Sequence, residues 1–201
     1  MNPSNTIDVS GLSRYNFGPQ APLWWGFVGM ILIEATVIAS LIASYFYLKM
    51  GSISWPPAGT EMPKLLLPTI NTFILLVSSL AMHRADKSIG EGKQKQLIRG
   101  LVIGIVLASV FLGIKAYEYS HLEYDWSTHS YGSIVWSISM FHAAHVLSVV
   151  LKTIIVAYLA VRGYFNQQRR LGVTVNGLYW HFVVVIWIPL YVVLYWSPRF
   201  L

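Results

Sequence analysis

Seven ionisable side chains of this 201-residue chain lie inside long apolar stretches, where charged groups are costly and commonly functional. They are Glu34, Lys115, Glu118, His142, His145, Lys152 and His181. Glu34 has no acid or base within one helical turn of its own stretch. Its carboxyl is therefore predicted either to relay protons or to bond to a lipid or a neighbouring subunit. The alternative is a neutral carboxyl that another helix satisfies.

The histidines raise the question of a bound metal. His142 and His145 are three residues apart and share one face of a predicted helix, and His181 follows Trp180 in a later stretch. Histidines on facing membrane helices can bind haem or copper. They also serve as hydrogen-bonding groups between helices, and the spacing here does not require a metal. We predict no metal site, and a cytochrome b-like protein that uses His181 with His142 or His145 remains the alternative.

Lys115 and Glu118 are three residues apart, which predicts an ion pair on one helix face, with His121 three residues further on. The sequence contains no glycine-rich phosphate loop and no nucleophile beside a base, so we predict no catalytic residue. A small transporter built on Glu34 is a third hypothesis.

The composition indicates an integral membrane protein. Apolar residues make up 55% of the chain and charged residues 11%, against about 25% charged in soluble domains. This balance excludes a disordered tail and argues against a nucleic-acid-binding domain. The absence of cysteine excludes disulfides, thiolate metal sites, iron–sulfur clusters and thiol catalysis.

Five apolar runs reach the length of about 20 residues that a bilayer-spanning helix needs. They cover residues 24–48, 65–83, 98–120, 132–161 and 173–196. The runs are continuous rather than alternating, which favours helices over barrel strands. We therefore predict an all-α membrane domain of five helices over residues 24–201, preceded by a polar cytoplasmic leader at residues 1–23 without a cleavable signal.

Basic residues predict the orientation, because short cytoplasmic loops are enriched in Lys and Arg. Residues 84–99 carry five, and the segment after the fourth run carries three: Arg84, Lys87, Lys93, Lys95, Arg99, Arg162, Arg169 and Arg170. The segment 121–131 carries none. The N-terminus is thus predicted in the cytoplasm and the C-terminus outside, and the net charge of +6 is a topology signal rather than a sign of nucleic-acid binding.

Small residues recur every four positions in two of the runs, which lets helices approach closely. These sets are Ala35, Ala39 and Ala43, and Gly100, Gly104 and Ala108.

Several short motifs, taken in order, resemble subunit III of the haem–copper respiratory oxidases, the cytochrome c oxidase subunit III family. They are Trp55-Pro56-Pro57, Leu67-Pro68 with Asn71-Thr72 and Ser78-Ser79, Ala116-Tyr117-Glu118-Tyr119, Phe141-His142 with His145-Val146, and Trp180-His181-Phe182-Val183 with Trp187. Each motif is short, but together they follow the family's order along nearly the whole chain from Trp24. The number of helices and the predicted orientation are similar to those of the family's five-helix form.

The resemblance implies a non-catalytic subunit of a proton-pumping oxidase in the bacterial cytoplasmic membrane. It implies that the chain packs against subunit I, belongs to a complex with subunit II and binds phospholipids in a cleft. It also implies that the chain supports proton uptake in aerobic respiration and protects the oxidase from inactivation during turnover. Haem and copper would then be held by partner subunits. The residues expected to serve proton uptake or the lipid cleft are Glu34, His142, His145, His181 and Glu118.

Two positions depart from the family's pattern. Glu34 matches its buried carboxylate but lies in Ile33-Glu34-Ala35, without the family's Ser and aromatic pair, and Val184 stands where the family has Asp. These departures indicate a divergent branch. They leave open a subunit III of a quinol oxidase or of a homologue associated with nitric oxide reductase.

Overall fold

The computed structural model describes residues 18–200, and over that range the regular structure is entirely helical. After a short turn η1 (Gly18–Gln20), the long helices are α1 (Pro22–Met50), α2 (Leu66–Gly90), α3 (Gln94–Ser120), α4 (Ser130–Val161) and α5 (Leu171–Tyr191). The last of them continues through a π-helical turn η2 (Val192–Trp196) into α6 (Ser197–Phe200). Five stretches are long and apolar enough to cross a membrane, which confirms the all-α, five-helix prediction. Of the predicted leader at residues 1–23, positions 1–17 lie outside the described residues.

Helices α2 and α3 extend beyond the apolar runs that predicted them. α2 continues from His83 to Gly90, and α3 begins at Gln94 rather than near Ile98. Only residues 91–93 connect the two helices, and Gly92 there has a φ of 75°, a conformation that favours glycine. Charged residues mark where the membrane ends, but a helix satisfies its own backbone in water as well as in lipid, so the charges do not end it.

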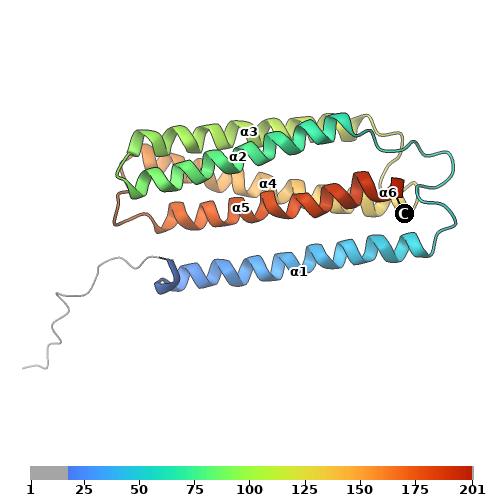
Figure 1. Ribbon diagram of the computed structural model, residues 1–201, viewed down its shortest axis with the longest axis horizontal. Helices are drawn as coiled ribbons and strands as arrows, with labels where there is room; N and C mark the ends of the chain where they lie inside the picture. Colours follow the sequence, from blue (N-terminus) through green and yellow to red (C-terminus); the bar gives the residue numbers. More distant parts are fainter. Residues whose placement is uncertain (1–17, 201) are drawn as a thin grey trace, which may run out of the picture.

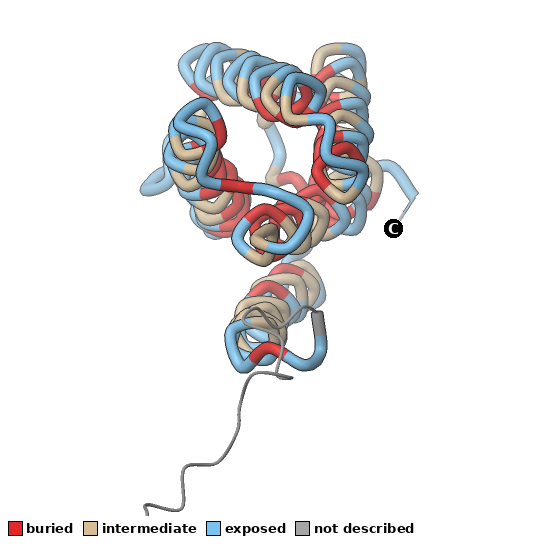
Figure 2. Tube along the Cα trace, turned by 90° about the vertical axis from the view of Figure 1, so that its left-hand side faces the viewer, coloured by how far each residue is buried: buried red, intermediate tan, exposed pale blue. Residues whose placement is uncertain are grey.

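Helices α2 to α5 pack around a shared interior, and α1 lies along one side of this group (Figures 1 and 2). α1 contacts α4 and α5, whereas α2 and α3 form the most extensive helix pair. Ile38 and Tyr45 are the buried residues of α1, while α4 and α5 each bury about ten or more side chains. α1 is therefore a peripheral helix with much of its apolar surface outside the bundle.

The two sets of small residues have different environments. A Cβ atom at Gly100 would lie 2.7 Å from the Cβ of Ala85 and 2.9 Å from the carbonyl oxygen of Ala81, so α2 and α3 are in close contact there. On α1, by contrast, Ala39 and Ala43 are exposed. The close approach that the spacing predicts is thus found between α2 and α3 but not along α1.

The described chain starts and ends at opposite ends of the bundle (Figure 1). The connection 91–93, which basic residues on the ends of α2 and α3 flank, and the basic connection 162–170 both lie at the end where α1 begins (Figure 1). Both connections that the sequence analysis assigned to one side of the membrane therefore share one end of the molecule.

Candidate functional site

Glu34 lies where α1 meets α4 and α5. The hydroxyl of Tyr179 on α5 donates a hydrogen bond to Oε1 of Glu34 over 3.2 Å. Nε2 of His145 on α4 is 3.5 Å from the other carboxyl oxygen, Oε2, which accepts no hydrogen bond from a described residue. The His145 and Glu34 side chains are 14% and 21% exposed, so the site is partly open at the side of the bundle.

A lysine completes this group of side chains. The ammonium of Lys152, two turns beyond His145 on α4, is 3.5 Å from the centre of the Tyr179 ring, a cation–π contact. Tyr179 thus joins Lys152 on its ring face to Glu34 at its hydroxyl. We call Glu34, His145, Lys152 and Tyr179 the Glu34 cluster.

A second ionisable group lies where α3 ends. Nζ of Lys115 is 2.9 Å from Oε2 of Glu118, which confirms the predicted ion pair, and the two side chains are only 5% and 15% exposed. Tyr195 donates a hydrogen bond of 2.5 Å to Oε1 of Glu118 and also contacts the Lys115 ammonium. We call Lys115, Glu118 and Tyr195 the Glu118 cluster.

Tyr195 reaches this cluster from a local irregularity of the last helix. Pro189 lies inside α5 and lacks a backbone N–H, and the π-helical turn η2 that contains Tyr195 begins three residues later. The ammonium of Lys115 also lies 4.8 Å from the ring centres of both Trp187 and Tyr195. The buried lysine is therefore surrounded by one carboxylate and by aromatic faces, which compensate part of the cost of its burial.

His142 has a separate environment in the interior of the bundle. It is 1% exposed, and its Nε2 lies 3.1 Å from the carbonyl oxygen of Val183 on α5. A carbonyl only accepts, so Nε2 carries the proton in this bond. The ring packs against Trp187 and Phe111 at centroid distances of 4.6 and 5.9 Å. Although His142 and His145 are three residues apart, one bonds to the backbone of α5 and the other faces α1.

His181 lies between α2 and α5. Its Nδ1 is hydrogen-bonded to Oγ of Ser79 over 2.6 Å, and its ring centre is 6.2 Å from that of His83. Within residues 18–200, no three His, Asp or Glu side chains are grouped closely enough to hold a metal ion. The partners of His142 and His181 are thus a carbonyl and a hydroxyl, an arrangement suited to fastening helices together.

The five residues that the sequence analysis expects to serve proton uptake or the lipid cleft thus lie in four separate parts of the bundle. Glu34 and His145 are brought together, whereas Glu118, His142 and His181 each lie elsewhere. Sequence reasoning missed Tyr179 and Tyr195 as the hydroxyl donors to the two carboxylates. A signal for Tyr179 existed, because it lies well inside the charge-free run of residues 171–198, away from the interface where membrane tyrosines usually gather.

The fold and these clusters define a multi-pass helical membrane protein with ionisable groups held between its helices. Comparison with known proteins then gives the family: the family described as Cytochrome c oxidase subunit III matches residues 9–198. The chain is 35% identical over 176 residues to cytochrome c oxidase subunit 3 of Thermostichus vulcanus, covering 87% of both chains. The corresponding protein of Synechocystis is 31% identical, over 95% of this chain and 82% of its own. That of Arabidopsis thaliana is 33% identical, over 88% of this chain and 69% of its own. The chain belongs to the cytochrome c oxidase subunit III family.

Proposed function

We propose that this chain is the non-catalytic subunit III of a proton-pumping cytochrome c oxidase in a bacterial cytoplasmic membrane. The observation that carries the proposal is the family match, which runs through all five membrane helices. In this role the chain packs against subunit I, belongs to a complex that includes subunit II, binds phospholipids and supports proton uptake during aerobic respiration. Haem and copper belong to the partner subunits.

The orientation follows the same reasoning as the sequence analysis. The connections 91–93 and 162–170, with the basic residues in or beside them, share one end of the bundle with the start of α1 (Figure 1), and we assign that end to the cytoplasm. The C-terminal end of α5 and the acidic segment after α3 then face outward.

In this proposal the Glu34 cluster serves proton uptake. The hydroxyl of Tyr179 fixes one carboxyl oxygen of Glu34, and the other oxygen is 3.5 Å from Nε2 of His145. A proton carried on either of these two atoms can pass to the other after a small side-chain movement. The partial exposure of both side chains supports a role in exchange with groups outside the chain.

The lipid role draws on the position of α1. Large apolar side chains of α1 such as Leu32, Ile33 and Tyr47 are exposed in the isolated chain, at 64%, 69% and 79%. In a membrane these surfaces are covered by acyl chains or by helices of a partner subunit. We propose that phospholipids occupy the surface beside α1 near the Glu34 cluster.

A tag on this chain tests the proposal. Purification from membranes in mild detergent is expected to bring down a haem-bearing subunit I with cytochrome c oxidase activity. A His181→Ala variant is a useful control, because it should leave the haem spectrum of the complex intact. Recovery of the chain as a stable monomer without an oxidase partner would contradict the proposal. So would a haem absorption band of the isolated chain that disappears in the His181→Ala variant.

A further inference from the structure

A histidine caps the start of α4, at the end of the bundle opposite to the start of α1 (Figure 1). The backbone N–H of Gly132 donates a hydrogen bond of 2.8 Å to Nδ1 of His129, which satisfies an N–H that has no acceptor within the helix. Ser, Thr, Asp and Asn are the usual residues at this position. Among helices α1 to α5 of the described chain, only α4 has a side-chain cap, and its cap is a group that titrates.

The hydrogen bonds of His129 determine which ring nitrogen carries the proton. A backbone N–H only donates, so Nδ1 is the unprotonated nitrogen, and in a neutral ring the proton is then on Nε2. Nε2 lies 3.3 Å from Oγ1 of Thr60, to which it can donate. Thr60 belongs to residues 51–65, which connect α1 to α2. Neutral His129 therefore joins this connection to the start of α4 through a single ring.

Two tyrosines are the titratable side chains that contact the ring. The ring centre of His129 is 5.3 Å from that of Tyr124 and 5.9 Å from that of Tyr131, and tyrosine is neutral in the pH range where histidine titrates. Glu61 and Asp125 lie in the two neighbouring segments, but among the described residues no carboxylate is within 4.0 Å of a nitrogen of His129. No acid is thus placed to hold a protonated ring where the neutral ring lies.

Protonation is incompatible with the cap. A protonated ring donates from both nitrogens, so Nδ1 can no longer accept from Gly132, and two N–H groups then face each other. The positive ring also lies at the N-terminus of α4, where the helix dipole disfavours a cation. The capped arrangement therefore binds fewer protons than an open one, which means that it is favoured as the pH rises and lost as the pH falls. Histidine makes this change between about pH 5 and pH 8.

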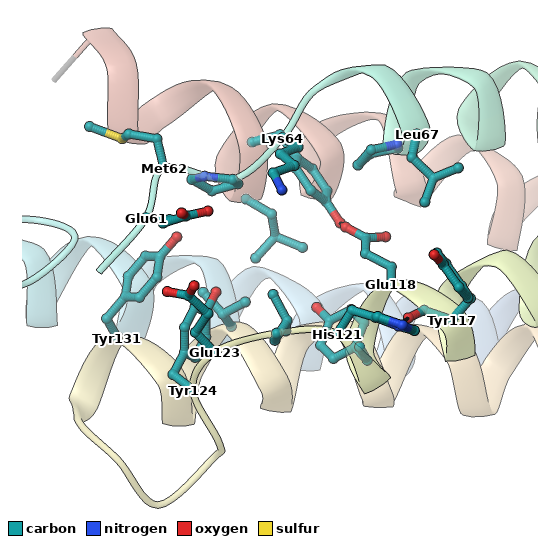
Figure 3. Close-up of a pocket in the computed structure, with 17 residues that line it drawn as sticks. Glu61, Met62, Lys64, Leu67, Tyr117, Glu118, His121, Glu123, Tyr124 and Tyr131 are labelled. Carbon is teal, nitrogen blue, oxygen red and sulfur yellow. Dashed lines mark hydrogen bonds between the residues drawn. The ribbon is translucent and has the colours of Figure 1, made fainter. Parts of the chain in front are cut away.

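The connection that His129 contacts is also one wall of a cavity. The cavity has a volume of about 360 Å³, and its lining includes residues 61–64, directly after Thr60, together with Tyr124 and Tyr131. Figure 3 shows Glu61 beside Tyr131 at one side of this cavity. Movement of the connection away from α4 would therefore widen the cavity from the side where His129 holds it.

We propose that His129 is a pH-sensitive latch, which holds residues 51–65 against the start of α4 when it is neutral and releases them when it is protonated. We assign this end of the bundle to the outer side of the membrane, the side to which a proton-pumping oxidase delivers protons. The latch then loosens this end of the chain as the outer side becomes acidic. Its physiological meaning rests on the proposed function, whereas the latch itself rests on the contacts of His129.

Hydrogen–deuterium exchange of the purified complex at about pH 8 and about pH 5.5 tests the latch, with rates corrected for the intrinsic effect of pH on exchange. In the wild type, we expect peptides that cover residues 57–63 and 130–135 to exchange about fivefold faster at the lower pH, the effect of losing one helix cap. His129→Asn keeps a capping side chain that does not titrate, so both peptides should stay protected at both pH values. His129→Ala lacks the cap and should show the faster exchange at both.

His121→Asn is the matched control, because His121 is an exposed histidine at the same end of the bundle whose Nδ1 lies 2.9 Å from the carbonyl oxygen of Tyr117 at the end of α3. This variant should keep the pH response of the wild type. Equal protection of the wild type at both pH values, a response that persists in His129→Asn, or one that spreads through all five helices would overturn the latch. Exchange is read from peptides of this chain, so the result is separate from the co-purification test of the oxidase function.

Discussion

The two carboxylate clusters use similar chemistry in different surroundings. Each has one glutamate, one lysine and a tyrosine hydroxyl that donates to the carboxylate. In the Glu118 cluster the lysine pairs directly with the acid in the interior of the bundle. In the Glu34 cluster the lysine lies over the ring of Tyr179, and one carboxyl oxygen is left without a hydrogen bond from a described residue.

We propose that this difference separates a structural site from one that can exchange protons. A buried pair whose partners are all satisfied has a single low-energy arrangement, and opening it is costly. A carboxyl with a free oxygen near a histidine, partly open to the outside, has more than one place for a proton. We therefore assign the Glu118 cluster mainly to stability and the Glu34 cluster mainly to function.

The largest expected effect comes from breaking the Glu118 cluster. Lys115→Met leaves Glu118 buried without its cation, and removing one partner of a buried pair costs about 3–5 kcal/mol. The thermal midpoint of the detergent-solubilised complex measures this loss. The double variant Lys115→Met/Glu118→Gln should recover much of it, because no unpaired charge remains. A single variant as stable as the wild type would show that the pair does not stabilise the fold.

The same substitution at the two tyrosines compares the clusters directly. Tyr195→Phe removes a hydrogen bond to a paired, buried carboxylate and should cost about 1.5–3 kcal/mol, whereas Tyr179→Phe should cost about 0.5–1.5 kcal/mol. Both variants keep the ring and its packing, so each serves as the control for the other. Thermal unfolding of the two complexes provides the measurement, and a reversed order would contradict our assignment of the clusters.

A pair of glycines tests whether α1 is packed more loosely than the other helices. Gly100→Ala places a Cβ 2.7 Å from that of Ala85 and should cost about 1–3 kcal/mol through overpacking. Gly26→Ala on α1 meets no atom within 4 Å and should be neutral or stabilising by up to about 1 kcal/mol, because alanine favours helix. Equal destabilisation by both would mean that α1 packs more tightly in the assembled complex than in this chain.

The smallest stability effect is expected at Glu34. Glu34→Gln keeps the shape of the side chain and an oxygen that can accept from Tyr179, so stability should change by less than about 0.5 kcal/mol. The haem spectrum and subunit content of the purified complex should also remain those of the wild type. If Glu34→Gln strongly reduced assembly of the complex, Glu34 would have a structural role like the one that we assign to Glu118.

Local patterns in the sequence predicted a large part of the structure. The apolar runs predicted the five helices, and the spacing of three residues predicted the Lys115–Glu118 pair, because both depend on residues close together in the chain. The ends of α2 and α3 were less predictable, since helical hydrogen bonds continue past the edge of an apolar run.

The partners of Glu34 could not be predicted from the sequence. They depend on which side of α1 faces α4 and α5, and α1 has apolar residues on every side, so its sequence does not favour one face. His142 and His145 illustrate the same limit. Three residues apart on one helix, they differ in burial and partners because different helices pack against them. The contact between Tyr195 and Glu118 depends in turn on the π-helical turn after Pro189.

The most direct test of the central claim is the turnover of the assembled oxidase that carries Glu34→Gln. Proton uptake and the number of turnovers before inactivation are measured beside wild type and beside a Glu91→Gln control, which changes an exposed acid paired with Lys93. Our account predicts that one or both fall in Glu34→Gln while the haem spectrum stays unchanged. Wild-type proton uptake and wild-type lifetime in this variant would contradict it and leave Glu34 a structural residue.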